Sequence, residues 1–130
     1  MYDRMVAFDG MTRDEAREFA SRWLPAWTGG DAGRLLALYT DDAVYSDPVV
    51  PGGVSGAALR EYLTKLLVRN PDWVWTQTDS IPIEGGFLNV WHARVPRPDG
   101  ESEWTGVCTC RVRDGLIYEN RVYMERGPGS

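Results

Sequence analysis

The residue of this sequence best suited to acid–base chemistry is Asp47, which directly precedes Pro48 at the end of a short extended segment. Burial beside tryptophan and valine side chains would disfavour the charged carboxylate and make it a stronger base. Such a base can remove a proton from a carbon next to a carbonyl group. The structural alternative is an aspartate that stabilises the turn before a proline.

Three further polar residues could complete such a site. His92 is the only histidine, and its imidazole titrates nearest neutrality, so it could be a second acid–base group or orient Asp47. Asn120 and Tyr45 could donate hydrogen bonds to a ligand carbonyl. Each has a plain structural alternative: the histidine bonds to neighbours on a sheet, and Asn120 and Tyr45 satisfy each other or the backbone.

For two more side chains, the sequence leaves both a functional and a structural role open. Arg94 could bind an enolate or carboxylate oxygen, or pair with an acidic neighbour at a pocket rim. Cys108 could be a nucleophile, although nothing adjacent in the sequence indicates an activated thiol, and it could equally be a small core residue. Cys108 and Cys110 with one histidine are too few ligands for a closed zinc site. We therefore expect neither a metal nor a cofactor.

The composition favours one domain that binds a small molecule. The chain has 130 residues, and its six Trp, six Tyr and three Phe are more than a plain core needs. Aromatic rings with polar tips suit the walls of a ligand cavity. The net charge of −5 without any basic run argues against nucleic acid and anionic membranes as partners. No apolar stretch could span a bilayer, and free thiols without a signal pattern predict a cytoplasmic location.

Helical signals occupy the first half of the chain. Residues 1–11 carry no pattern and are expected to form a loose arm. Thr12 and Glu15 form a capping box for a helix whose apolar residues recur at helical spacing. Asp31 can cap a second, shorter helix. Ser55 can cap a third helix, whose apolar stripe includes Leu63 and Leu67.

The second half reads as strands. A short strand is expected at 43–47, and four longer ones at about 73–83, 87–97, 102–113 and 116–126. Glycine-containing turns separate the long strands, which is the signal of consecutive hairpins. Helices followed by an antiparallel meander predict an α+β fold. The domain should span residues 12–126, followed by a tail at 127–130.

Period-two alternation then divides the side chains between two faces of the sheet. We expect helix residues Trp23, Leu63 and Leu67 to close a pocket over one of these faces. The face itself is predicted to present Tyr45, Asp47, Val90, His92, Arg94, Trp104, Cys108, Asn120, Val122 and Met124. A mostly apolar surface with few polar groups is typical of a small-molecule site.

The stretch from Leu38 to Pro48 (LYTDDAVYSDP), followed by a loop and Ser55-Gly56 opening a helix, resembles the signature region of the nuclear transport factor two-like families. The final segment 114–125 (DGLIYENRVYME) is similar to their closing strand. The group includes ketosteroid isomerases, SnoaL-like polyketide cyclases and limonene epoxide hydrolases. The resemblance covers about residues 12–126, and implies a cone-shaped pocket made by a curved sheet and about three helices.

The resemblance assigns roles residue by residue. The catalytic base of the ketosteroid isomerases falls on Asp47, and a helper tyrosine falls on Tyr39. Their two oxyanion-hole donors fall on Trp23 and Cys108, so both donors are replaced. The Asp-Arg-Asp relay of the epoxide hydrolases falls near His92, Val90 and Val122 and is absent. Polyketide cyclases of this fold need only an acid–base carboxylate in an apolar cavity, which this sequence can provide.

Two functions follow from these observations. The first is a cofactor-independent cyclase or isomerase in which Asp47 is the general base for a small apolar carbonyl compound. The second is a non-catalytic domain of the same fold that binds a small ligand or serves in dimerisation. Related domains pair through the outer sheet face, so the resemblance implies a homodimer, with Trp91, Val107 and Tyr123 expected on that face.

Overall fold

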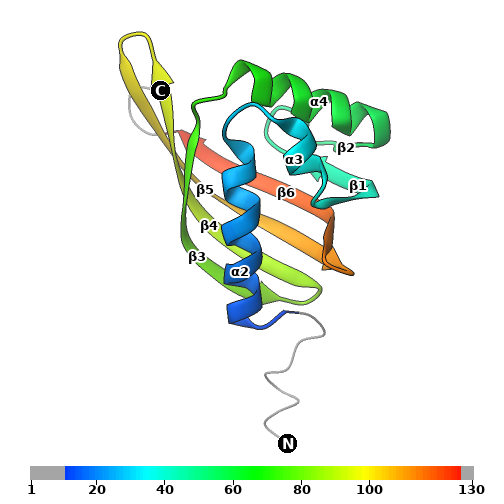
Figure 1. Ribbon diagram of the computed structural model, residues 1–130. Helices are drawn as coiled ribbons and strands as arrows, with labels where there is room; N and C mark the ends of the chain where they lie inside the picture. The colour runs from blue at the N-terminus through cyan, green and yellow to red at the C-terminus, as the bar shows by residue number, and fades with distance from the viewer. Residues whose placement is uncertain (1–10, 127–130) are drawn as a thin grey trace, which may run out of the picture.

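The computed structural model describes residues 11–126, so the predicted arm, apart from Met11, and the predicted tail lie outside the described residues. Within these residues, three α-helices and one short 3-10 helix accompany a six-stranded curved sheet, which is the predicted α+β class. Figure 1 shows helix α2 lying across one face of the sheet, with α3 and α4 near the β1 edge. Within this part of the chain no helix combines the length and the apolar composition that crossing a membrane requires.

Helix α2 (Arg13–Trp23) begins where the capping box predicts. The Thr12 side chain accepts a hydrogen bond from the Glu15 amide at 3.1 Å, and the Glu15 carboxylate accepts one from the Thr12 amide at 2.9 Å. These reciprocal bonds satisfy two amides that the first turn leaves without helical partners. Pro25 does not kink α2, because it lies in the separate 3-10 helix η1 (Leu24–Trp27) that follows.

The other two helices differ in how they begin. Asp31 caps α3 (Ala32–Leu36) by accepting a hydrogen bond from the Arg34 amide at 3.2 Å, as predicted. Ser55 precedes α4 (Gly56–Arg69) but makes no side-chain cap bond. Its backbone belongs instead to a short strand that the sequence did not indicate, so capping by Ser55 was wrong.

The sheet has the order β2-β1-β6-β5-β4-β3 and is antiparallel except for the β1–β6 pair, which is parallel. Its strands are β1 (Tyr39–Ser46), β2 (Val54–Ser55), β3 (Val74–Ile83), β4 (Gly86–Arg97), β5 (Gly100–Arg113) and β6 (Leu116–Arg126). The four long strands match the predicted hairpins. Strand β1 is longer than predicted, and β2 lies beside it.

In strand β4 the side chains alternate in the opposite sense to the prediction, so the residues expected on the inner face lie on the outer face. Trp91, expected on the outer face, is only 2% exposed and lies on the inner face, so Val90, His92 and Arg94 point outward. Both faces of this segment carry apolar residues, so alternation alone does not decide which face is buried. The pairing partner decides it: Trp91 lies opposite Gly106, where a Cβ atom would stand 2.5 Å from the indole Cζ2. The missing side chain leaves the inner face open to the ring.

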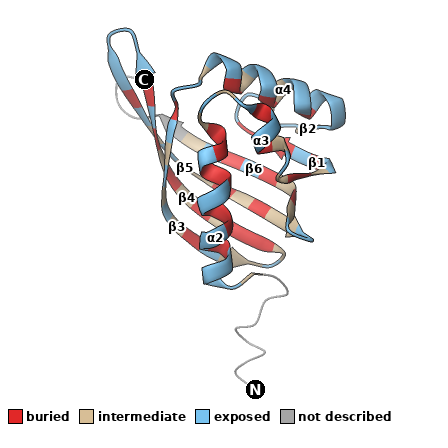
Figure 2. Ribbon diagram, viewed as in Figure 1, coloured by how far each residue is buried: buried red, intermediate tan, exposed pale blue. Residues whose placement is uncertain are grey.

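The buried residues gather between α2 and the inner face of the sheet (Figure 2). Phe19 of α2 packs on Phe87 of β4 with ring centroids 5.7 Å apart. Leu59, Leu63 and Leu67 of α4 are 3% exposed or less. This core fixes α2 and α4 over the sheet and holds the cavity described next.

Candidate functional site

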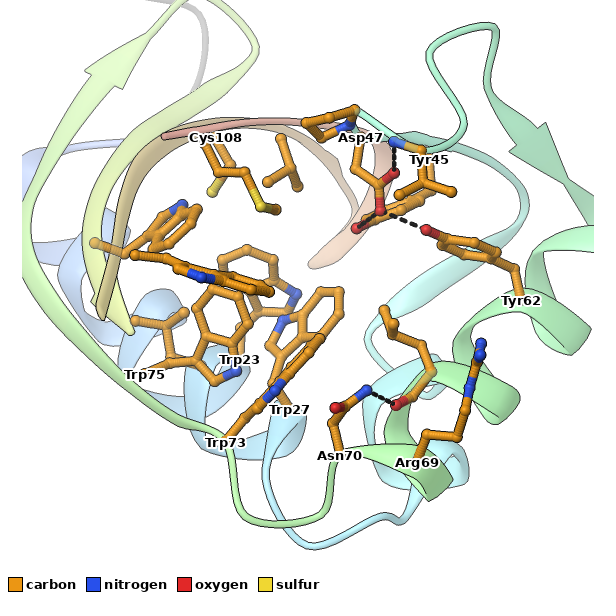
Figure 3. A pocket seen from close by; sticks show the side chains of 18 residues that line it. Trp23, Trp27, Tyr45, Asp47, Tyr62, Arg69, Asn70, Trp73, Trp75 and Cys108 are labelled. Atoms are coloured by element: carbon orange, nitrogen blue, oxygen red, sulfur yellow. Dashed lines mark hydrogen bonds between the residues drawn. The ribbon is translucent and has the colours of Figure 1, made fainter. Parts of the chain in front are cut away.

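A cavity of about 710 Å³ lies over the inner face of the sheet, next to η1 and α4. All six tryptophans of the chain line it: Trp23, Trp27, Trp73, Trp75, Trp91 and Trp104. They come from α2, η1, the turn before β3, and strands β3, β4 and β5. Figure 3 shows the rings gathered on one side of the cavity, with Asp47, Tyr45 and Tyr62 on the other.

The tryptophans form a continuous aromatic wall. The centroids of Trp75 and Trp91 are 4.8 Å apart, and Trp73 lies 5.5 Å from Trp75 and 5.8 Å from Trp104. Trp27 continues the wall, 5.8 Å from Trp75. Tilted and edge-to-face geometries at these separations are the preferred arrangements of aromatic pairs. The rings therefore hold one another in place as a preformed surface.

Asp47 follows the last residue of β1 and is 7% exposed. Its Oδ1 accepts hydrogen bonds from the amides of Val49 at 2.8 Å and Val50 at 3.1 Å, which is the turn-stabilising role foreseen as the alternative. Its Oδ2 accepts hydrogen bonds from the hydroxyls of Tyr45 at 2.9 Å and Tyr62 at 2.7 Å. One oxygen thus organises the turn, while the other belongs to a cluster of phenols at the cavity wall.

Burial and the nearby carboxylate act on both phenols in the same direction. Burial first, and then the charge of Asp47, raises the pKa of Tyr45 well above its usual value. Burial, followed by the hydrogen bond to Asp47, also raises the pKa of Tyr62. Both hydroxyls therefore stay protonated and remain donors at any working pH. The two phenols and the two backbone amides together donate four hydrogen bonds to the Asp47 side chain.

Asn120 and Tyr39 belong to a separate buried network and do not line the cavity. The Trp23 indole N–H donates to the Tyr39 hydroxyl at 3.2 Å, and that hydroxyl donates to Asn120 Oδ1 at 2.7 Å. The Asn120 amide group in turn donates to the Thr109 carbonyl at 3.3 Å. Burial raises the pKa of Tyr39 well above its ordinary value. The polar atoms of Asn120 are thus paired within the protein, as its structural alternative expected.

The outward phase of β4 removes three predicted residues from the cavity. His92 Nε2 lies 3.3 Å from a carboxylate oxygen of Glu103 on the neighbouring strand. Arg94 is exposed, and Val90 is half-buried on the same outer face. The predicted orientation of these three side chains is therefore corrected, and neither His92 nor Arg94 can touch a ligand in the cavity.

On α4 the cavity meets a different side of the helix from the predicted one. Leu63 and Leu67 are completely buried in the core, whereas Tyr62 and Leu66 line the cavity. The other predicted residues that line the cavity are Trp23, Tyr45, Asp47, Trp104, Cys108, Val122 and Met124.

Sequence reasoning missed several lining residues: Trp27, Tyr62, Trp73, Trp75 and Trp91. The unusual tryptophan content was the signal that could have found four of them. Nothing in the local pattern connects Tyr62 with Asp47, which is fifteen positions earlier. Among residues 11–126, no three side chains of the histidine, cysteine, aspartate or glutamate type come together as metal ligands do.

The fold and the pocket place this chain in a known class of domains. The family model of the SnoaL-like domain matches residues 20–120, so the chain belongs to the SnoaL-like family of the nuclear transport factor two-like fold. No curated protein sequence matches it significantly.

Solved structures share the architecture at low sequence identity. AclR, a putative hydroxylase from Streptomyces galilaeus, superposes with a TM-score of 0.73 at 16% identity, over 90% of this chain and 83% of that one. RV0760c from Mycobacterium tuberculosis has a TM-score of 0.73 at 23% identity, over 91% and 100% of the two chains. The Delta 5-3-ketosteroid isomerase from a Mycobacterium species has a TM-score of 0.68 at 25% identity, over 86% and 98%.

Proposed function

We propose that this protein is a cofactor-independent isomerase or cyclase, in which Asp47 is the general base for a small, largely apolar carbonyl compound. The observation that carries the proposal is a buried carboxylate at the wall of an otherwise aromatic cavity. A cavity of about 710 Å³ falls in the usual range for small-molecule sites. RV0760c has also been solved with estradiol-17beta-hemisuccinate, which supports a ligand of this general size.

The phenol cluster supplies the electrophilic side of this chemistry. Asp47 takes a proton from the carbon next to the carbonyl, and the electron pair of that C–H bond moves onto the carbonyl oxygen as an enolate. Tyr62, which reaches Asp47 from α4, shifts its hydrogen bond from Asp47 Oδ2 to the carbonyl oxygen as the proton moves. That shift frees the lone pair of Oδ2 that takes the proton, and it places a donor on the enolate oxygen. The proton returns from Asp47 to a different carbon in an isomerisation.

This arrangement differs from the one the resemblance implied. The donors replaced at Trp23 and Cys108 find a substitute in Tyr62, rather than in Asn120 or His92. Tyr45 also donates to Asp47 Oδ2 and holds the carboxylate against the aromatic wall. We infer that these two tyrosines are the acid-side partners of Asp47.

The test is turnover by Asp47→Asn on a panel of ketosteroids and polyketide-like phenols. We expect product formation to be abolished, while ligand affinity stays within about tenfold, or roughly 1.4 kcal/mol. Asp42→Asn is the matched control. Asp42 is exposed on β1, so this substitution removes the same charge outside the cavity. Unchanged turnover in the Asp47 variant would refute the assignment.

A second candidate is a non-catalytic small-ligand-binding domain. One observation favours it: Asp47 already accepts four hydrogen bonds, about as many as a carboxylate can. A base so occupied must lose a bond before it can accept a proton. Quenching of tryptophan fluorescence by panel compounds, without product after long incubation, would support this function over catalysis.

We also propose that the chain forms a homodimer through the outer face of the sheet. Val90, Val107 and Tyr123 are successive cross-strand neighbours on that face, and Tyr123 is 54% exposed. An apolar row across three strands can be covered by its own copy about a two-fold axis. Trp91, which was expected there, takes no part because it faces the cavity.

A further inference from the structure

The aromatic wall is unusual in its chemistry, because every tryptophan of the chain contributes to it. Indole has the strongest quadrupole of the protein rings, and its face attracts cations better than tyrosine or phenylalanine does. The aromatic surface continues toward the carboxylate. Trp27 lies 6.1 Å from Tyr45, and Tyr45 lies 5.8 Å from Tyr62, both measured between ring centroids.

The charged side chain buried in the cavity wall is an acidic one. Asp47 is buried, and within residues 11–126 no arginine, lysine or histidine forms an ion pair with it. Among the described residues that line the cavity, Arg69 is the one cationic residue, and it is exposed at the C-terminal end of α4. A desolvated negative charge attracts a cation far more strongly than one in water does. An anionic ligand would meet repulsion at the same place.

The hydrogen bonds that Asp47 already accepts indicate which class of ammonium group the cavity would bind. Both carboxylate oxygens already accept two bonds each, so a ligand there can sense the charge but gains little as a hydrogen-bond donor. A primary ammonium group would need acceptors for three N–H groups. A tertiary or quaternary ammonium group has one N–H or none, and its positively charged methyl surface fits against ring faces.

We propose that the cavity recognises an organic cation, namely a tertiary or quaternary ammonium group on an apolar body, held between the tryptophan wall and the buried carboxylate of Asp47. The inference goes beyond the proposed function, because it concerns the charge of the ligand and applies to turnover and to simple binding alike. A cationic nitrogen close to the reacting carbon would also make its C–H bond more acidic.

The test compares two probes of nearly the same shape that differ in charge, (meta-hydroxyphenyl)trimethylammonium and meta-tert-butylphenol. Affinities are measured by tryptophan fluorescence and by titration calorimetry. We expect the cation to bind at least about tenfold more tightly, a difference to which both the tryptophan faces and the carboxylate contribute. Asp47→Asn should lower this ratio, because it removes the carboxylate's share and leaves the tryptophan wall in place, and the control Asp42→Asn should leave the ratio unchanged.

The wild-type protein alone decides the matter even if a variant fails to fold. Equal or tighter binding of meta-tert-butylphenol, or binding of neither probe, would overturn the inference. Tighter binding of the neutral probe would leave the proposed function standing, since that function needs an apolar carbonyl ligand and is refuted only by turnover that survives Asp47→Asn. The two failures are therefore distinguishable.

Discussion

Raising the pH should destabilise this protein in two stages, because three buried acids keep their protons in the folded state. Burial raises the pKa of the Cys110 thiol above its usual value of 9, and burial raises the pKa of the Tyr39 and Tyr45 hydroxyls above 10. In the unfolded chain these groups ionise at their ordinary values. Their contribution to stability is therefore complete below about pH 9 and is lost as the pH rises above it.

The slope of the free energy of unfolding against pH follows from the number of buried acids that keep their protons. Each group whose ionisation is suppressed in the folded state lowers the free energy of unfolding by up to about 1.4 kcal/mol per pH unit. Cys110 acts alone between about pH 9 and 10, and these three groups together give a slope of about 4 kcal/mol per pH unit once the two buried tyrosines join it. The half-buried Tyr62, whose pKa is also raised, steepens the slope further. A domain with a typical stability of about 5–15 kcal/mol then unfolds within a few pH units above pH 10.

Urea unfolding at a series of pH values measures this slope. Tyr39→Phe and Tyr45→Phe should each reduce it above pH 10 by about 1.4 kcal/mol per pH unit, whatever they do to stability at neutral pH. Tyr123→Phe is the matched control at protein concentrations low enough to dissociate the proposed dimer, because that ring is then exposed on the outer face and its replacement should leave the slope unchanged. A slope that neither core variant alters, or tyrosinate absorbance from Tyr39 and Tyr45 at pH 10 in the folded protein, would refute the reasoning.

Two further predictions concern the sheet. Gly106→Ala should destabilise the fold by about 3 kcal/mol in urea unfolding, because the new Cβ would stand 2.3 Å from the Tyr123 carbonyl oxygen and 2.5 Å from the Trp91 ring. Gly52→Ala, with nothing within 4 Å of its Cβ, should cost little, and similar losses in the two variants would contradict the role given to Gly106. Tyr123→Glu should convert the proposed homodimer to a monomer in analytical ultracentrifugation, and a monomeric wild type at micromolar concentration would contradict the dimer.

Local signals in the sequence were sufficient to predict the capped starts of α2 and α3 and the hairpins. The capping box of Thr12 and Glu15 involves residues three positions apart, and the turns at Gly85 and Gly115 use positive φ angles that glycine adopts readily. Interactions of this range depend on neighbours in the chain. The family resemblance and the choice of Asp47 as the candidate base also come from a contiguous stretch of sequence.

The tertiary structure alone decided which residues meet. The phase of β4 depends on Gly106 in the neighbouring strand, and because both faces of β4 carry apolar side chains, periodicity could not place His92. The partnership of Tyr62 with Asp47 joins a helix to a strand end. The tryptophan wall joins segments that are up to eighty-one positions apart, from Trp23 to Trp104. Such contacts form only when the sheet curves and the helices pack over it, because no short-range interaction specifies them.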